Sequence, residues 1–115
     1  MSEEDALQRL RIYCSDDHRV AGRPIHEAIV ERAQQLGLAG ATVLRGVMGF
    51  GSDSHIHTAK VLRLSNGLPL IVEVVDRPER IESLLGALEP LGLRNFATLE
   101  PVSLAFSARD QLSGV

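Results

Sequence analysis

The sequence contains one cysteine, no tryptophan and few other aromatic residues. Aromatic side chains make up 3% of the 115 residues, and Cys14 is the single cysteine. One cysteine excludes an internal disulfide, and we interpret Cys14, which lies in an apolar run, as a small buried hydrophobe rather than a catalytic thiolate. So few rings leave few stacking platforms for single-stranded nucleic acid. The core must therefore be aliphatic.

An excess of positive charge and a long hydrophobic run are also missing. The net charge of −3 and the isoelectric point of about 5.8 disfavour nucleic-acid binding, which relies on a basic surface. No apolar run approaches the roughly 20 residues that span a bilayer. The acidic residues 1–5 are unlike a signal peptide. We therefore expect a cytoplasmic protein that binds no nucleic acid.

Apolar residues at helical spacing predict two helices. The first begins near Pro24, which suits a first turn, and ends at Gly37 in the left-handed position that follows a helix. For the second, Asp76 is the expected cap, because Glu79 lies three residues on in a capping-box pattern. Pro90 should end this helix.

Alternating or continuous apolar residues predict four strands, at 9–14, 41–48, 68–75 and 97–106. Pro101 removes a ladder donor from the last strand, which should therefore lie at a sheet edge or carry a bulge. Residues 60–64 are expected to pair as a further short strand, before a tight turn at Asn66-Gly67.

The resulting order is β-α-β-β-α-β, and a weak internal repeat supports it. The repeated pairs are Arg23-Pro24 with Arg77-Pro78 and Leu36-Gly37-Leu38 with Leu91-Gly92-Leu93. Two right-handed β-α-β units predict an α+β, ferredoxin-like sandwich: a four-stranded antiparallel sheet of order 4-1-3-2 with both helices on one face. We expect one domain over residues 7–106, with flexible tails at 1–6 and 107–115.

The sheet face opposite the helices must then be explained. The strand patterns give it a mixed polar and apolar set: Arg9, Arg11 and Tyr13 with Ile71, Glu73 and Val75, or with the alternate residues of that strand. Because exposing the apolar residues of this face to water is unfavourable, we expect them to be buried in a homo-oligomer. Glu73, in a central strand, is expected to form an ion pair with Arg11 or Arg45.

The most distinctive segment has three glycines around one phenylalanine: Gly46, Gly49, Phe50 and Gly51. Glycine tolerates positive φ and close approach, so these residues can curl the chain and direct amide N–H groups inward. With Arg45, His57 and Lys60 nearby, such a loop would suit an anion such as phosphate. A plain hairpin is the simpler interpretation from local sequence, since glycine clusters mark turns far more often than ligand sites.

The patterns that indicate other chemistry are weak. His55 and His57 would point the same way in an extended segment, and Asp53 and His18 are possible further metal ligands, but a fixed ligand set is missing. No phosphate-binding P-loop or dinucleotide fingerprint occurs, and serines beside histidines in a loop do not make a triad. We therefore expect no enzymatic activity.

Two runs of the glycine-rich segment carry a family resemblance. Residues 40–51, Gly-Ala-Thr-Val-Leu-Arg-Gly-Val-Met-Gly-Phe-Gly, and residues 56–60 closely resemble the PII-like family of uncharacterised bacterial and archaeal proteins. Further matches lie at 10–13, 22–30 and 68–76, so the resemblance spans about residues 10–106. It implies a ferredoxin-like subunit in a trimer, with kinship to nitrogen-regulatory PII and CutA-type proteins.

The resemblance also implies a function. In PII proteins the corresponding loop docks onto transporters and enzymes, and nucleotide binds between subunits at its base. This chain would then be a signalling homotrimer with a small anionic ligand, such as an adenine nucleotide, at the subunit cleft. A partner such as a membrane transporter would bind through residues 46–57. The implied ligand-binding residues are Arg45, Gly46, Gly49, Phe50, Gly51, His57, Lys60 and Arg94.

The chain also departs from PII. The glycine- and lysine-rich loop that holds the nucleotide phosphates in PII has no counterpart here, where residues 91–96 carry the single cation Arg94. The alternative that the resemblance leaves open is a CutA-like metal-tolerance trimer, with His55 and His57 as metal ligands.

Overall fold

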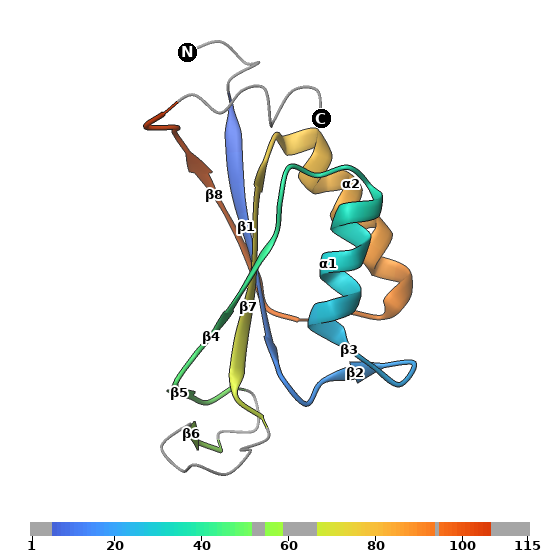
Figure 1. Cartoon of the computed structure of the whole chain (residues 1–115), viewed down its shortest axis with the longest axis vertical. Coiled ribbons are helices and arrows are strands. Elements are labelled where there is room, and N and C mark those ends of the chain that lie inside the picture. Colours follow the sequence, from blue (N-terminus) through green and yellow to red (C-terminus); the bar gives the residue numbers. More distant parts are fainter. Residues whose placement is uncertain (1–5, 52–54, 59–66, 94, 107–115) are drawn as a thin grey trace.

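A four-stranded antiparallel sheet with two helices on one face forms the part of the chain that the computed structural model describes, residues 6–51, 55–58, 67–93 and 95–106 (Figure 1). The elements of this sandwich are β1 (Leu7–Ser15), α1 (Ile25–Gln35), β4 (Thr42–Arg45), β7 (Pro69–Asp76), α2 (Pro78–Leu88) and β8 (Ala97–Val102). The predicted α+β architecture is confirmed.

The order of the main sheet is β8-β1-β7-β4. Counted over its four strands in chain order this is 4-1-3-2, as predicted, with the proline-bearing β8 at an edge. The structure differs from the prediction by adding two small two-stranded sheets. One pairs β2 (Arg19–Val20) with β3 (Arg23–Pro24), and the other pairs β5 (Met48–Gly49) with β6 (His57–Thr58).

Several predicted boundaries are wrong. The second strand was expected to run to Met48, but β4 ends at Arg45 because the chain leaves the sheet at Gly46. The last strand ends at Val102 rather than residue 106. Helix α2 ends at Leu88, just before Pro90 as expected, and a 3₁₀ turn follows over Glu89–Leu91. The predicted strand at 60–64 and Asn66 lie outside the described residues.

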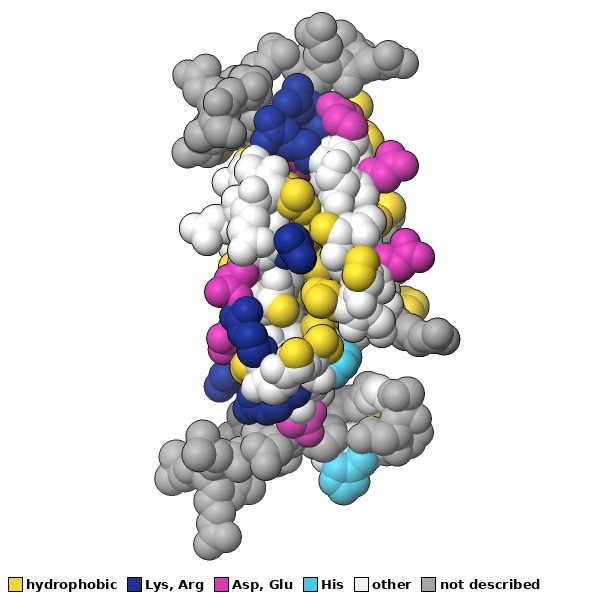
Figure 2. Space-filling model, turned by 90° about the vertical axis from the view of Figure 1, so that its right-hand side faces the viewer, with side chains coloured by type: hydrophobic (Ala, Val, Ile, Leu, Met, Phe, Trp, Pro, Cys, Tyr) yellow, Lys and Arg dark blue, Asp and Glu magenta, His cyan; other side chains and the backbone are white. Residues whose placement is uncertain are grey.

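The core lies between the helices and the inward-facing residues of β1 and β7. In β7 every second residue is buried, as expected for a strand with one face on the core. The buried cluster is aliphatic and consists of Leu10, Ile12, Ile25, Ile29, Ala33, Val72, Val74, Ile81, Leu84 and Leu88. Figure 2 looks onto the helices and shows hydrophobic side chains gathered along the middle of this face, with most charged side chains toward its edges.

Helix α1 ends as the sequence predicts. Gly37 has φ +78° and donates its N–H to the Gln34 carbonyl at 3.1 Å. Leu38 donates to the Ala33 carbonyl, also at 3.1 Å. These two bonds form a Schellman motif, which satisfies carbonyls that the end of the helix would leave unpaired.

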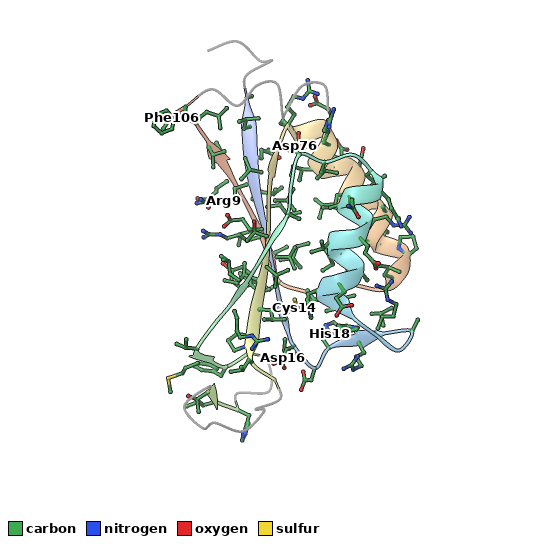
Figure 3. The ribbon with its side chains drawn as sticks, in the orientation of Figure 1. Arg9, Cys14, Asp16, His18, Asp76 and Phe106 are labelled. Atoms are coloured by element: carbon green, nitrogen blue, oxygen red, sulfur yellow. The ribbon has the colours of Figure 1, made fainter. Side chains whose placement is uncertain are left out.

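Asp76 does not cap α2, so this prediction is wrong. The N-cap is Arg77, with no side-chain cap bond, because β7 continues one residue further and turns Asp76 into the core. Asp76 is fully buried at the junction of β7 and α2 (Figure 3). Its Oδ1 accepts the Arg77 N–H at 2.7 Å and its Oδ2 accepts the Ala39 N–H at 2.9 Å. The carboxylate thus ties the segment before β4 to the start of α2.

The second face of the sheet carries ion pairs and is not covered by a helix (Figure 1). Arg11 Nε donates to Glu73 Oε2 at 2.9 Å, which confirms one of the two partners expected for Glu73. This hydrogen bond raises the pKa of the Arg11 guanidinium above its ordinary value. On the same face, Arg9 of β1 pairs with the other neighbouring strand, β8, where its Nε donates to Glu100 Oε1 at 2.8 Å. The charges on this face are therefore neutralised in pairs.

In the described part of the chain, no helix has both the length and the apolar character needed to cross a membrane.

Replacing Asp76 should destabilise the fold. Asp76→Ala removes the acceptor of two backbone N–H groups, and each one left unsatisfied costs about 1–3 kcal/mol. We expect the free energy of unfolding, measured by urea denaturation, to fall by about 2 kcal/mol or more. The control is Glu82→Ala, at an exposed position on α2. Equal losses for the two variants would contradict this role of Asp76.

Candidate functional site

A cleft of about 650 Å³ opens at the end of the sheet where β1 ends and β7 begins. Four segments far apart in the sequence line it. They are the end of β1 with the turn after it, residues 49–51, the start of β7, and the connection between α2 and β8. Residues 46–51 and 55–58, which carry the small sheet β5–β6, are called the arm below. The cleft therefore lies at the base of the arm.

Close contact with Pro69 fixes this base. Gly46 donates its N–H to the Pro69 carbonyl at 2.7 Å. A Cβ atom at Gly46 would lie 2.7 Å from Pro69 Cγ, and one at Gly49 would lie 3.1 Å from the same atom. The first distance is below any normal carbon–carbon contact, so the backbone approaches Pro69 only because position 46 has no side chain.

The expected use of the arm glycines is thus partly wrong. The described glycines with positive φ are Gly22, Gly37, Gly67 and Gly92, and none of them lies in the arm. Gly46 and Gly49 allow close approach rather than a left-handed backbone. The Gly46 N–H is already bonded to Pro69, so in this conformation it is not directed at an anion.

Asp16 holds the other side of the base, at the end of β1 (Figure 3). Its Oδ1 accepts the N–H groups of Gly67 at 2.6 Å and of Leu68 at 3.1 Å. The Asp16 N–H in turn donates to the Leu68 carbonyl at 3.0 Å. The sequence analysis missed this role. The available signal was an aspartate at a strand end, a residue type whose short carboxylate readily accepts turn N–H groups.

One wall of the cleft is aromatic and is tied to β1 through the backbone. The rings of Tyr13 and Phe96 lie 5.4 Å apart at 55°. The Tyr13 N–H donates to the Phe96 carbonyl at 2.9 Å, and Asn95 Nδ2 donates to the Tyr13 carbonyl, also at 2.9 Å. A planar ligand would find here an aromatic surface held in place by two hydrogen bonds.

The polar part of the lining follows directly after β1. Ser15 Oγ donates to Asp17 Oδ1 at 2.5 Å, and His18 Nδ1 lies 3.4 Å from Asn95 Nδ2. Of this set the sequence analysis considered only His18, and as a metal ligand. Ser15 and Asp17 are two residues apart and make a local contact, whereas Asn95 reaches this turn only through long-range packing, which periodicity could not reveal.

Cys14 also lines the cleft but is not a reactive thiolate. It is half-buried and packs against the core. Burial raises the pKa of its thiol to about 11, so the thiol is neutral at physiological pH. This agrees with its interpretation as a small hydrophobe.

The structure brings together part of the predicted site. Gly49, Phe50 and Gly51 line the cleft. Arg45 is exposed on β4 opposite Leu70, a lining residue, and so stands beside the cleft rather than in its wall. His57 pairs with Gly49 between β6 and β5. Lys60 and Arg94 lie outside the described residues, as does Asp53.

In the described part of the chain, the structure does not bring together the ligands that the alternative metal site would need. Among the described residues, no three His, Cys, Asp or Glu side chains come together as a metal site would need. His55 is exposed and is in the arm, whereas His18 is in the cleft wall.

The arm exposes apolar side chains. Val47 is 76% exposed and Phe50 is 70% exposed, and Met48 and Ile56 are also largely exposed. An exposed apolar group of this kind on one short segment is typical of a surface that contacts another molecule.

The fold is a PII-like fold, and comparison with known proteins agrees. Over residues 7–104 the chain matches the DUF190 family, described as Uncharacterized ACR, and it belongs to that family. A UPF0166 protein of Aquifex aeolicus is 37% identical over 98 residues, which is 84% of this chain and 91% of the relative.

Solved structures show the same fold at low sequence identity. One is CPII, a nitrogen regulatory PII-like protein of Thiomonas intermedia K12, bound to ADP, AMP and bicarbonate. It superposes with a TM-score of 0.62 at 16% identity, over 88% of this chain and 90% of CPII. The divalent ion tolerance protein CutA1 of Ehrlichia chaffeensis gives 0.53 at 6% identity, over 90% and 86% of the two chains.

The role of Gly46 can be tested with a matched glycine. Gly46→Ala places a methyl group against the Pro69 ring, and overpacking of this kind costs about 1–3 kcal/mol. Gly51→Ala meets no atom within 4 Å. We expect a lower thermal midpoint for the first variant and little change for the second. Two unchanged midpoints would show that the arm base tolerates displacement.

Proposed function

We propose that this protein is a PII-like regulatory protein without enzymatic activity. It acts as a cytoplasmic homotrimer, binds a small anionic ligand such as an adenine nucleotide in the cleft, and docks a partner protein, such as a membrane transporter, through the arm. One observation carries the proposal: Phe50 belongs both to the lining of the cleft and to the exposed apolar surface of the arm. A ligand in the cleft would therefore touch the docking surface directly.

The character of the cleft supports a planar ligand with an anionic part. The rings of Tyr13 and Phe96 offer a stacking surface for a base. Arg45 pairs with Leu70, a lining residue, across β4 and β7, and we propose that its guanidinium binds a phosphate at the edge of the cleft. Lys60 and Arg94 are the further cations we propose for it. The fold neighbour CPII was solved with ADP and AMP.

The open face of the sheet supports the trimer. Leu44, Ile71 and Tyr13 lie side by side across three strands on this face. The flanking carboxylates of Glu73 and Glu100 are already paired with arginines, so burying the face against another copy would leave neither charge unpaired. A second and third copy of the chain would remove this mixed surface from water.

The cleft offers little for catalysis. Within its described lining, the Cys14 thiol is neutral because burial raises its pKa to about 11, so it is not an activated nucleophile. Regulation requires only that the ligand bind one arrangement of the arm better than another, which shifts the population of docking-competent molecules.

The trimer can be tested on its proposed interface. Ile71→Asp puts an unpaired charge at the centre of the open face, and we expect light scattering to return a monomer where the original chain returns a trimer. Leu85→Asp makes the same change at an exposed apolar position on α2 and should leave the trimer intact. A monomeric original chain at micromolar concentration would contradict the proposal, as would an intact trimer for Ile71→Asp.

Ligand binding can be tested by calorimetry with ADP. If Arg45 contacts phosphate, Arg45→Ala removes a charge-assisted hydrogen bond and should weaken binding by about 10- to 100-fold. Arg32→Ala, on the exposed side of α1, is the control and should bind as the original chain does. Absence of ADP binding by the original chain at millimolar concentration would contradict the nucleotide as ligand.

A further inference from the structure

The main sheet ends in two strands, β4 and β8, whose outer edges have no neighbouring strand in the described part of the chain. An open edge presents backbone N–H and C=O groups that can pair with another strand, and natural proteins usually cover, shorten or interrupt such an edge. Pro101 interrupts β8, but the residues before it leave the edge open. The two edges are therefore candidate contact surfaces.

The hydrogen-bonding pattern identifies the free backbone groups of β8. The Tyr13 N–H donates to the Phe96 carbonyl at 2.9 Å, and the same register continues over β1 and β8. Because hydrogen-bonded and non-hydrogen-bonded pairs alternate in an antiparallel ladder, the backbone groups of Ala97, Leu99 and Pro101 point away from β1. Proline has no N–H, so the donors at this edge belong to Ala97 and Leu99.

The same reasoning identifies the free backbone groups of β4. The Gly46 N–H donates to the Pro69 carbonyl at 2.7 Å, and this register continues over β4 and β7. The outward backbone groups of β4 are then those of Val43 and Arg45. The two edges match in spacing, since on each of them two residues with a free N–H lie two positions apart.

The side chains at the two edges also fit a joining of the strands. Val43 lies opposite the buried Val72, and Leu99 lies opposite the buried Leu10, so both side chains are on the helix side of the sheet. Even so, Val43 is 36% exposed and Leu99 is 50% exposed, which shows that the helices leave the edge strands partly uncovered. A contact between the two edges would bring these apolar side chains together and remove them from water.

We propose that β4 of one copy of the chain pairs antiparallel with β8 of a second copy. Val43 then lies opposite Leu99, and Arg45 lies opposite Ala97. This rests on the trimer proposed above and specifies the surfaces that form it. In this register both outward residues of β4 meet the two free donors of β8, and Pro101 falls beyond the last of these pairs.

Charge supports this register at the cleft end of the sheet. Arg45 is exposed on β4, and the exposed Glu89 borders the same small groove as Ala97, on the helix side of β8. With Arg45 opposite Ala97 of the second copy, the guanidinium and the Glu89 carboxylate lie on the same side of the joined sheet. Before a ligand binds, their attraction would favour this contact over a shifted one.

The direction of the strands allows a closed ring. Neighbouring strands of the main sheet are antiparallel, so its two edge strands run in opposite directions. A second copy in the same orientation therefore continues the sheet with an antiparallel pair and with its helices on the same side. Such a contact uses different surfaces on its two sides, and it forms a ring where the rotation closes. A ring that curves toward the open faces of the sheets also buries them.

Disulfide cross-linking of the full-length chain tests the pairing. A double variant with Val43→Cys and Leu99→Cys places one thiol on each edge. Opposed residues of a hydrogen-bonded pair have Cα atoms about 5.5 Å apart, a distance that a disulfide spans. Under mild oxidation we expect non-reducing electrophoresis to show a covalent trimer as the main product, because each copy is linked on both sides. Each single variant, which also carries Cys14, should stay monomeric on the same gel.

A second opposed pair and a shifted pair check the register. Arg45→Cys with Ala97→Cys should also cross-link, and this pair keeps the test decisive if the first double variant does not fold. Val43→Cys with Ala97→Cys is shifted by two residues, which places the Cα atoms about 7–8 Å apart, at or beyond the limit for a disulfide. We expect the shifted pair to cross-link at least about tenfold less. Equal cross-linking of the shifted pair would overturn the register.

Light scattering of the reduced original chain separates the remaining outcomes. A trimer in which neither opposed pair cross-links would overturn the edge contact and leave the trimer in place. Covalent dimers of a single variant would overturn the edge contact as well, because they indicate that like edges pair. A monomeric original chain would overturn both the edge contact and the proposed trimer.

Discussion

The close approach of Gly46 to Pro69 is the contact on which the arm and the cleft depend. It takes the chain out of the sheet at the end of β4, and the hydrogen bond between the Gly46 N–H and the Pro69 carbonyl closes one side of the base. Asp16 closes the other side through the N–H groups of Gly67 and Leu68. Because the arm is anchored at Gly46 beside residues of the cleft lining, we propose that a change in the cleft acts on the arm at this attachment.

The two faces of the sheet have different roles. The inner face, with an aliphatic cluster and the buried Asp76, stabilises the subunit. The outer face, opposite the helices, carries arginine–glutamate pairs and a few apolar side chains. We propose that it forms the contact between subunits. The cleft is lined by four segments that are far apart in the sequence. Its geometry therefore depends on the whole sandwich and not on the arm alone.

The sequence was sufficient to predict the architecture but not the site. Periodicity is a local signal, and it correctly predicted the four strands of the main sheet, apart from some of their ends, the two helices and the end of α1 at Gly37. Asp76 shows its limit: the capping pattern was present, but β7 ran one residue further and buried the carboxylate. The contacts of Asp16 and Asn95 were missed because they form only through long-range packing. Of the two reasons given for the arm glycines, positive φ and close approach, the structure supports close approach, at Gly46 and Gly49.

The central claim is that occupation of the cleft changes the arm. Hydrogen exchange of the full-length protein, followed by mass spectrometry with and without saturating ADP, tests it most directly. The account predicts that the amides of the arm and of the start of β7 change their exchange rate, while those in the centre of β1 and β7 do not, because these amides are bonded within the sheet. Binding of ADP with unchanged exchange in the arm would contradict the claim.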